Sequence, residues 1–341
     1  MIHIDGSIGE GGGQILRTSI ALSAVTGRKI RIFNIRAKRQ NPGLGYQHIA
    51  AIKAVSQLCK ADTTGVEMGS KEITFSPMKI KGKRINIDVG TAGSLTLVLQ
   101  ALMIPAIYAP NEVIITLKGG TDVRYSPPID YLRFVTLPIL RRFNYNADIE
   151  LIRRGYYPKG GGRILVRIKP SELDKIVLKN RGEIVSVGGI SHAHRDLENA
   201  MVALRQIKGA RSVIYNYLLK NENYKGKIEI KGEYANTLSY GSGILLYART
   251  ENSVIGSSSL GERGKRAEIV GMEAGKKLVE ELKTNMALDR YMADQIVPYL
   301  ALAGGKIGVS DITEHCRTNI EVVRKFGFDV RVRDSSIISQ E

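Results

Sequence analysis

The segment EHCRTNIEVV, residues 314–323, places a histidine beside a cysteine where the pattern predicts the start of a helix. Asp311, with Glu314 three positions later, has the spacing of a variant capping box, so we expect the helix to begin near Ile312. His315 then lies in the first turn, where the positive end of the helix dipole disfavours the imidazolium ion. A neutral ring nitrogen is the nucleophilic form, and the same helix end would stabilise a phosphate attached to it.

The residues alone leave two interpretations of His315 open. Asn319 lies one turn further on the same face, while Ile320 and Val323 mark the buried stripe and leave His315 at its margin. Histidines at helix starts are common, and the sequence identifies no base or orienting carboxylate for this one. His315 is therefore a candidate nucleophile, with an ordinary surface or core-edge histidine as the alternative.

A glycine-rich stretch near the N-terminus, DGSIGEGGGQILR, leads into another predicted helix. Bare backbone N–H groups at such a turn hold phosphate, although no GK[ST] follows and the spacing does not match a dinucleotide fingerprint. Glu10 would repel phosphate unless a cation lay between them, so it is a candidate Mg²⁺ ligand beside a triphosphate. A carboxylate that stabilises the helix start is the alternative.

The stretch NIRAKRQNPGLGYQH carries Arg36, Lys38 and Arg39 within four residues, followed by Gln47 and His48 at a helix start. Arginine presents a planar fork of donors, so such a loop makes a phosphate clamp. The alternative is a solvated basic loop.

Two other patterns are weaker. SHAH places His192 and His194 two residues apart, as two zinc ligands on a strand can be, but no third ligand is spaced to complete a site, so a solvated turn is favoured. The run YYPKGGGR, residues 156–163, predicts a turn that requires positive φ.

Composition restricts the partners. The chain of 341 residues has 50 Lys+Arg against 33 Asp+Glu, a net charge of +17, which attracts polyanions unless the whole proteome is basic. Aromatic residues make up 6% with no Trp, which favours phosphate contact over base stacking. Cys59 and Cys316 cannot form a disulfide framework, and neither a membrane span nor a signal peptide is evident, so we expect a cytoplasmic protein without a membrane partner.

Apolar periodicity predicts an α/β chain in which one unit of strands and two helices recurs. The first helices of the three copies begin near residues 12, 91 and 290, so roughly 120 extra residues separate the second copy from the third. We expect an inserted smaller α/β domain at residues 182–283, and a three-unit domain formed by residues 1–181 and 284–341. The insertion is expected to hold a helix RDLENAMVALRQI followed by a strand SVIYNYL, and the first unit a strand near GVEM.

These stretches together resemble the RNA 3′-terminal phosphate cyclase family. The matching text, in the family's order and over nearly the whole chain, is DGSIGEGGGQILR, IRAKRQNPGL.YQH, GTAGSLTLVLQ, RGYYPKGGG, RYMADQIVPYLALAGG and EHCRTNI. The resemblance implies three copies of a unit with two helices packed on a four-stranded sheet, as in enolpyruvyl transferases, with a smaller inserted α/β domain.

The resemblance also implies a reaction that uses ATP and a divalent cation, Mg²⁺ or Mn²⁺. A histidine, matched by His315, forms a covalent adduct with AMP and passes it to an RNA 3′-phosphate, giving an RNA-(3′)pp(5′)A anhydride. The neighbouring ribose 2′-hydroxyl then attacks the activated phosphorus, which expels AMP and leaves a 2′,3′-cyclic phosphate.

Other positions match the family one at a time. Glu10 matches its metal-binding acid, and Pro127 or Pro128 with Tyr291 would stack on the adenine base. The resemblance implies that the nucleotide is bound by Arg17, Arg36, Arg39, Gln47, Gln100, Pro128, Tyr291, Met292, Ala293, Asp294 and Gln295.

The expected partner is RNA with a 3′-phosphate end, and a homo-oligomer is left open. One branch of the family lacks the histidine and serves in ribosome assembly, whereas His315 places this chain with the active branch. A non-catalytic RNA-binding assembly factor of the same fold is the alternative. An enolpyruvyl-type transferase would need a phosphoenolpyruvate site and gives no reason for a nucleophilic His315.

Overall fold

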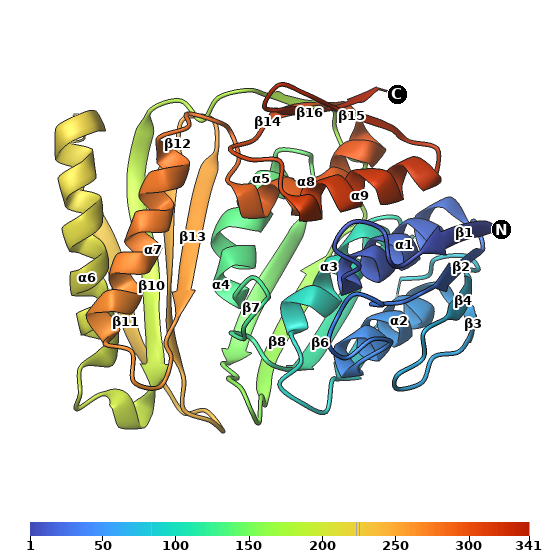
Figure 1. Cartoon of the computed structure of the whole chain (residues 1–341), viewed down its shortest axis with the longest axis horizontal. Coiled ribbons are helices and arrows are strands. Elements are labelled where there is room, and N and C mark those ends of the chain that lie inside the picture. The colour runs from blue at the N-terminus through green and yellow to red at the C-terminus, as the bar shows by residue number, and fades with distance from the viewer. Residues whose placement is uncertain (83, 223, 225, 341) are drawn as a thin grey trace.

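The computed structural model describes residues 1–340 except 83, 223 and 225. Its strands form four sheets of four strands each, and three of these sheets have the same topology (Figure 1). The predicted α/β architecture of repeated units is therefore confirmed. Among the described residues, no helix is long and apolar enough to cross a membrane.

The first unit contains β1 (Ile2–Asp5), α1 (Gly13–Thr26), β2 (Ile30–Phe33), α2 (Tyr46–Cys59), β3 (Asp62–Thr64) and β4 (Ile73–Ser76). The second contains β5 (Arg84–Asp88), α3 (Leu95–Ala106), β6 (Val113–Gly119), α4 (Ile129–Tyr131), a π-helical turn (Leu132–Thr136), α5 (Leu137–Arg141), β7 (Ala147–Arg153) and β8 (Gly162–Ile168). The third contains β9 (Ile176–Leu178), α8 (Arg290–Ala303), β14 (Gly305–Gly308), α9 (Glu314–Lys325), β15 (Asp329–Arg333) and β16 (Ser336–Gln340).

The three sheets have the same strand order. It reads β1-β2-β4-β3 in the first unit, β5-β6-β8-β7 in the second and β9-β14-β16-β15 in the third. In each sheet the first two strands are parallel and the other neighbours are antiparallel. Because β9 precedes the extra residues and α8 follows them, the insertion interrupts the third unit between its first strand and its first helix.

The insertion forms the fourth sheet and two long helices. Its elements are β10 (Ile184–His194), a 3₁₀ turn (Arg195–Leu197), α6 (Val202–Tyr217), a π-helical turn (Leu218–Glu222), β11 (Ile228–Ala235), β12 (Ser242–Thr250), β13 (Val254–Leu260) and α7 (Ala267–Leu282). Their strand order is β11-β10-β12-β13, and their apolar side chains form a core separate from that of the three units. The division into domains at residues 182 and 283 stays a prediction.

The helices of the three units meet inside the larger body, with the sheets outside them (Figure 1). Helix α1 packs against α2, α3 and α9, and α8 packs against α9 and α3. One hydrophobic core runs through all three units. This arrangement brings the start of α1 beside the start of α9, which are 301 residues apart in the sequence.

Three details of the predicted elements are wrong. The segment SVIYNYL is the end of α6 and the turn after it, because Ile207, Ala210 and Ile214 are buried at helical spacing and this packing outweighs the strand preference of β-branched and aromatic residues. The strand expected near GVEM lies earlier, at β3. The helix expected from Arg195 begins only at Val202.

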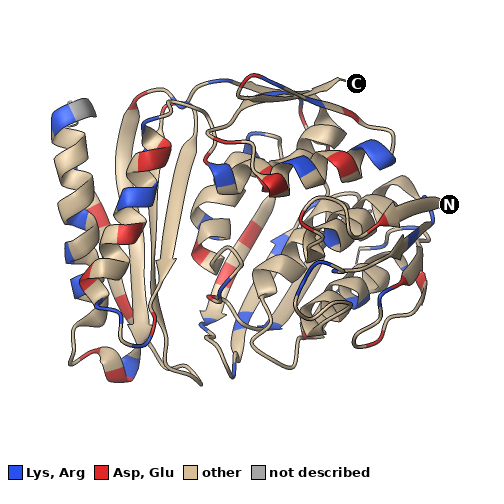
Figure 2. Ribbon diagram, viewed as in Figure 1, with Lys and Arg blue, Asp and Glu red and all other residues tan. Residues whose placement is uncertain are grey.

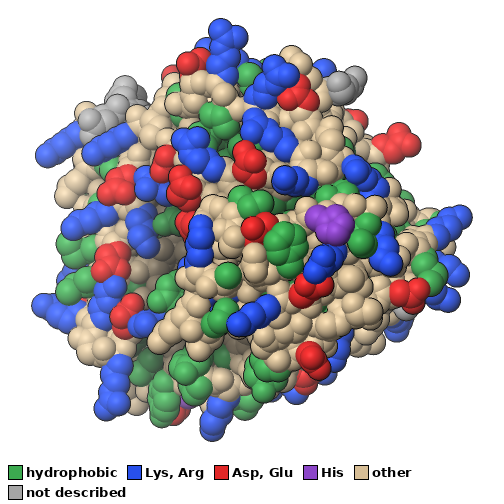
Figure 3. Space-filling model, turned by 45° about the vertical axis from the view of Figure 1, so that its right-hand side comes forward, with side chains coloured by type: hydrophobic (Ala, Val, Ile, Leu, Met, Phe, Trp, Pro, Cys, Tyr) green, Lys and Arg blue, Asp and Glu red, His purple; other side chains and the backbone are tan. Residues whose placement is uncertain are grey.

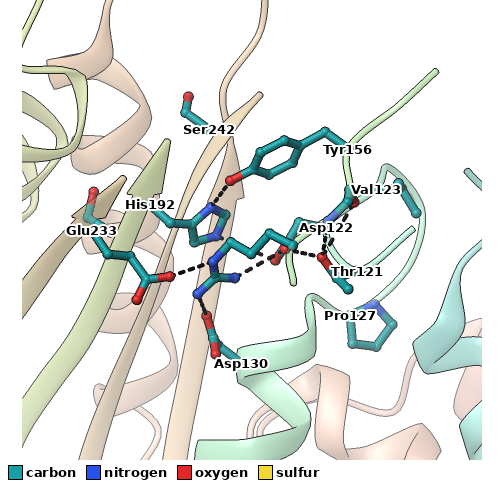
Figure 4. Close-up of polar contacts among 12 residues, drawn as sticks. Thr121, Asp122, Val123, Pro127, Asp130, Tyr156, His192, Glu233 and Ser242 are labelled. Atoms are coloured by element: carbon teal, nitrogen blue, oxygen red, sulfur yellow. Dashed lines mark hydrogen bonds and ion pairs between the residues drawn. The ribbon is translucent and has the colours of Figure 1, made fainter. Parts of the chain in front are cut away.

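A buried ion network joins the second unit to the insertion (Figure 4). The guanidinium of Arg154 lies 3.1 Å from Asp122, 2.5 Å from Asp130 and 2.5 Å from Glu233 of β11. Arg154 and both aspartates are buried. Three carboxylates around one guanidinium satisfy its fork of donors at the contact between the two bodies.

His192 belongs to this junction, so the solvated turn predicted for SHAH is wrong at this position. Its ring is buried, with Nδ1 2.8 Å from the Tyr156 hydroxyl and Nε2 3.4 Å from Asp122. His194 instead accepts a hydrogen bond from the Asp196 N–H. Within the described part of the chain, no three His, Cys, Asp or Glu side chains are grouped as a metal site. The positive φ predicted for the YYPKGGGR turn is found at Gly160 and Gly161.

The Arg154 network predicts a large cost for one substitution. Replacing Arg154 with Met leaves the buried Asp122 without a guanidinium and the buried Asp130 with Arg133 alone, so we expect the free energy of unfolding to fall by about 3–5 kcal/mol. Arg331→Met is the matched control, because it breaks an exposed pair with Asp329 and should cost about 0–1 kcal/mol. Denaturant unfolding of both variants measures this, and equal losses would contradict the role of the network.

Candidate active site

Two polar pairs fix the contact between α1 and α9. Gln14 and Thr18 lie one turn apart on α1, opposite His315 and Asn319, which lie one turn apart on α9. The Thr18 hydroxyl donates to Asn319 Oδ1 over 2.7 Å, and Asn319 Nδ2 donates to the Asp294 carbonyl over 2.7 Å. Since these groups are largely buried, a shift of one helix along the other would leave them unpaired, at about 1–3 kcal/mol for each.

Gln14 fixes the tautomer of the His315 ring. Its Nε2 donates to the His315 carbonyl over 3.0 Å, and its Oε1 lies 2.6 Å from Nδ1. A carbonyl only accepts, so the amide nitrogen must face it and the amide oxygen must face the ring. The proton is then on Nδ1, and a neutral His315 carries its lone pair on Nε2.

His315 lies in the first turn of α9, but the predicted cap is wrong. The N-cap is Thr313, whose hydroxyl accepts from the Cys316 N–H over 3.1 Å, and the helix begins at Glu314 instead of near Ile312. Thr313 takes this place because its extended backbone points the hydroxyl at the free N–H groups of the first turn. The ring is 45% exposed, so Nε2 is open to a ligand.

Glu10 faces the open nitrogen of this ring. Its Oε2 lies 3.1 Å from His315 Nε2 and 3.1 Å from Arg39 Nη2. A carboxylate and an unprotonated ring nitrogen are both acceptors, so this contact needs a second proton on the ring or a cation on the carboxylate. Burial lowers the pKa of His315, with smaller lowering effects from Arg39 and Arg17, while Glu10 alone acts in the opposite direction.

The glycines of the first loop are required by close packing. At Gly13, a Cβ atom would lie 2.3 Å from Nε2 of His48, and at Gly9 it would lie 2.1 Å from the Thr318 hydroxyl on α9. Gly9 also has a φ of +55°, which side chains rarely adopt. These two glycines let the loop with Glu10 reach both α2 and α9.

Basic residues surround this loop, and of these Arg39 is paired with Glu10. Burial lowers the pKa of Arg17 to about 10 and also lowers that of Arg36, whose Nη1 donates to the Gly43 carbonyl over 2.8 Å. Arg17 makes no hydrogen bond or ion pair with any residue in the described part of the chain. A desolvated guanidinium with unused donors is suited to an anionic ligand.

His48 is kept neutral among these cations. Burial lowers its pKa to about 3, helped by Arg17 and Arg36, and its Nδ1 accepts from the Gly45 N–H over 3.0 Å. On the face shown in Figure 3, Lys and Arg side chains are spread out with acidic side chains between them. The local grouping of Arg17, Arg36 and Arg39 is therefore more informative than the net charge.

Asp289 positions α8 and the predicted nucleotide segment that begins there. Its carboxylate accepts from the N–H groups of Tyr291 and Met292, from the Tyr131 hydroxyl and from the Gly256 N–H of β13. It thereby joins the third unit, the second unit and the insertion at one helix start.

The nucleotide segment has one face in the core and one toward the site. Tyr291 is 44% exposed, whereas Met292 and Ala293 are completely buried in the core and offer no accessible surface to a ligand. Gln295 Nε2 donates to the Tyr291 carbonyl over 2.7 Å. Burial raises the pKa of Asp294 to about 7, and Arg17 acts against this rise.

The remaining predicted residues lie around α3. Gln47 Oε1 accepts from the Ser94 N–H at the start of α3 over 3.2 Å. Gln100 is half-buried on the same helix, and the buried Pro128 immediately precedes α4. The contacts of the described residues join Glu10, Arg39 and His315 directly, but they do not join these α3 residues to His315.

Sequence reasoning missed Gln14, which makes the most consequential contact with His315. Its only signal was the spacing of Gln14 and Thr18, two polar residues one turn apart on a helix that is largely buried. Their partners are 301 residues away, so no local pattern could have identified the pairs.

Within a repeated α/β fold, His315 Nε2 lies beside Glu10 and Arg39, with the buried Arg17 near the same loop, an arrangement suited to an anionic ligand. The family model described as RNA 3′-terminal phosphate cyclase matches residues 8–333. A protein named RNA 3′-terminal phosphate cyclase from Ignicoccus hospitalis is 49% identical over 100% of this chain and 96% of its own length. Proteins of the same name from Pyrococcus furiosus and Saccharolobus solfataricus are 48% and 46% identical, over 96% and 98% of this chain and 93% and 96% of their own lengths. The chain belongs to the RNA 3′-terminal phosphate cyclase family, and the prediction that it is an enzyme of this family is confirmed.

The Gln14 contact predicts opposite effects of two substitutions on the pKa of His315. In Gln14→Glu a carboxylate faces the Nδ1 proton and stabilises imidazolium, so the pKa should rise. Gln14→Met removes both hydrogen bonds without adding charge and should produce no such rise. NMR titration of the His315 ring measures both values, and an equal rise in the two variants would contradict the assigned tautomer.

The raised pKa of Asp294 predicts a pH-dependent effect on stability. A carboxyl group with a pKa of about 7 when folded and 3.8 when unfolded favours folding at low pH, and this contribution is lost as the pH rises through 7. The stability of Asp294→Asn relative to the original chain should therefore increase between pH 5 and pH 8. Asp148→Asn, at an exposed position of β7, controls for the loss of one negative charge. A pH-independent difference for Asp294→Asn would contradict the buried, protonated carboxyl.

Proposed function

We propose that this enzyme converts an RNA 3′-terminal phosphate to a 2′,3′-cyclic phosphate, with ATP as the second substrate and a covalent histidine–AMP intermediate. One observation carries the proposal: Gln14 holds His315 so that the lone pair of Nε2 is directed toward Glu10, Arg39 and Arg17 at a helix start. The family membership and the names of the relatives support the substrate class.

In the first step, Nε2 of His315 attacks the α-phosphorus of ATP, and the bond to pyrophosphate breaks. Arg17, Arg36 and Arg39 supply donors for the phosphate oxygens, and the first turn of α9 adds its free N–H groups. The Nδ1 proton stays on the ring, where Gln14 Oε1 stabilises the positive charge that develops as the N–P bond forms.

In the second step, an oxygen of the RNA 3′-phosphate attacks the phosphorus of the adduct, and the N–P bond breaks. His315 regains its lone pair, and the anhydride RNA-(3′)pp(5′)A is formed. In the third step, the ribose 2′-oxygen attacks the RNA phosphorus, its proton passes to solvent or a base, and AMP leaves. The product is the 2′,3′-cyclic phosphate.

Glu10 is the residue that would hold a divalent cation, Mg²⁺ or Mn²⁺. The lack of a three-ligand cluster in the described chain fits an ion of this kind, because Mg²⁺ is commonly bound by one or two carboxylates together with substrate phosphates. Such a cation neutralises phosphate charge when bound. A carboxylate engaged in this way would no longer face the lone pair of His315 Nε2 as an uncompensated acceptor, so the acceptor–acceptor contact would be relieved.

His315 and the nucleotide can be tested together. The purified protein is incubated with α-labelled ATP and a divalent cation, and label on the denatured chain is measured. We expect acid-labile, alkali-stable label that is absent in His315→Ala and retained in His3→Ala, a control at an exposed histidine of β1. Absence of label in the original chain, with ATP binding intact, would favour a non-catalytic RNA-binding assembly factor instead.

A further inference from the structure

A long groove runs along the insertion between one face of α6 and the strand β11. Its volume is about 1090 Å³, and both its walls belong to the insertion. Strand β11 is an edge strand, hydrogen-bonded only to β10 among the described strands. Helix α6 lies at the opposite end of the molecule from α1 and α2 (Figure 1), so this groove is separate from the site around His315.

The lining of the groove is strongly basic. Lys208 and Arg211 of α6 face Lys227 and Lys231 beside and on β11, and among the described residues of the lining Glu229 is the only acid. The three lysines form no ion pair with any residue in the described ranges. Figure 2 shows basic residues on successive turns of α6. Four cations against one anion make a local field that attracts a polyanion.

Exposed apolar side chains lie between these charges. Tyr215 is 57% exposed, Leu204 is 54% exposed and Leu219 is 56% exposed, and all three line the groove. Along one helix face, at spacings of three or four residues, the order is Leu204, Lys208, Arg211, Tyr215 and Leu219. A flat aromatic ring among cations is the combination that binds single-stranded nucleic acid, because bases stack on the ring while phosphates contact the charges.

We propose that this groove binds a single-stranded segment of the RNA substrate, at a distance from the 3′ end that reacts. The identity of the polymer rests on the proposed function. The alternative occupant, an added strand of another polypeptide, fits less well because lysines on an edge strand discourage strand pairing. In addition, Arg211 Nη2 already donates to the Ile228 carbonyl of β11 over 3.3 Å.

The substrate length on which the groove acts follows from its place in the molecule. An RNA of three nucleotides held at His315 is too short to reach the groove at the far side of α6. A chain of about 20 nucleotides is several times longer and can extend from His315 to the groove. The groove therefore contributes to the binding of long RNA and leaves the reaction of very short RNA unchanged. This difference separates its role from that of the active site.

The test compares two double variants with the same change of charge in the same domain. Lys208→Glu with Lys231→Glu reverses two charges in the groove. Lys276→Glu with Lys283→Glu reverses two exposed charges, one on α7 and one at its C-terminal cap, outside the groove. Binding of a labelled single-stranded RNA of 20 nucleotides with a 3′-phosphate is followed by fluorescence anisotropy, without ATP, over a range of salt concentrations.

We expect the groove variant to bind the 20-nucleotide RNA about tenfold or more weakly than the α7 variant, with the slope of log Kd against log salt reduced by about 1.4 for two lost phosphate contacts. Tyr215→Ala should weaken binding by about fivefold or more without changing this slope, because stacking does not involve counterions. In turnover, the groove variant should raise KM for the long RNA and leave kcat/KM for a trinucleotide unchanged.

Equal losses in the two double variants would overturn the proposal, because they would show a general effect of charge. Unchanged binding in both would overturn it as well. A monomer–dimer change in sedimentation confined to the groove variant, without weaker RNA binding, would assign the groove to another protein chain instead. Since binding is measured without ATP, a chain that bound the long RNA through the groove but cyclised no RNA would contradict the proposed function and not this inference.

Discussion

The active site depends on one contact between the first and third units, the side-chain amide of Gln14 against the ring and carbonyl of His315. This amide determines which ring nitrogen is free, and the Thr18–Asn319 pair one turn further along holds the two helices in register. Neither helix alone determines which ring nitrogen is free. The three-unit arrangement, in which the helices face inward, is therefore what fixes the orientation and tautomer of a histidine at a helix start.

The electrostatics of the site are adjusted by burial more than by pairing. Arg17 is desolvated without a partner, the pKa of Asp294 is raised to about 7, and that of His48 is lowered to about 3. Burying the Arg17 guanidinium without a hydrogen-bonded carboxylate costs stability, and an anionic ligand would offset that cost. Gly9 and Gly13 contribute to the same site, since they let the loop backbone approach α9 and His48 closely.

The sequence was sufficient for the repeated α/β units and for the position of His315 in a first helical turn, because each has a local signal in periodicity or in glycine and polar residues near helix ends. It was insufficient where the structure depends on contacts between segments that lie far apart in the chain. His192 is buried in a junction formed with Asp122 and Tyr156, which lie far from it in the chain, and the end of α6 is helical because of the sheet beneath it. Gln14 was missed for the same reason. The helix is capped by Thr313 and not by Asp311, and only the backbone conformation distinguishes these two polar residues.

The central claim, that Gln14 leaves the lone pair on Nε2, is tested most directly by locating the bond in the covalent adduct. The protein is labelled with ¹⁵N-histidine, reacted with ATP and a divalent cation, and the ³¹P–¹⁵N coupling of the adduct is measured by NMR after denaturation. The account predicts that phosphorus is coupled to Nε2 of His315. Phosphorus bonded to Nδ1, or to any other histidine, would contradict it.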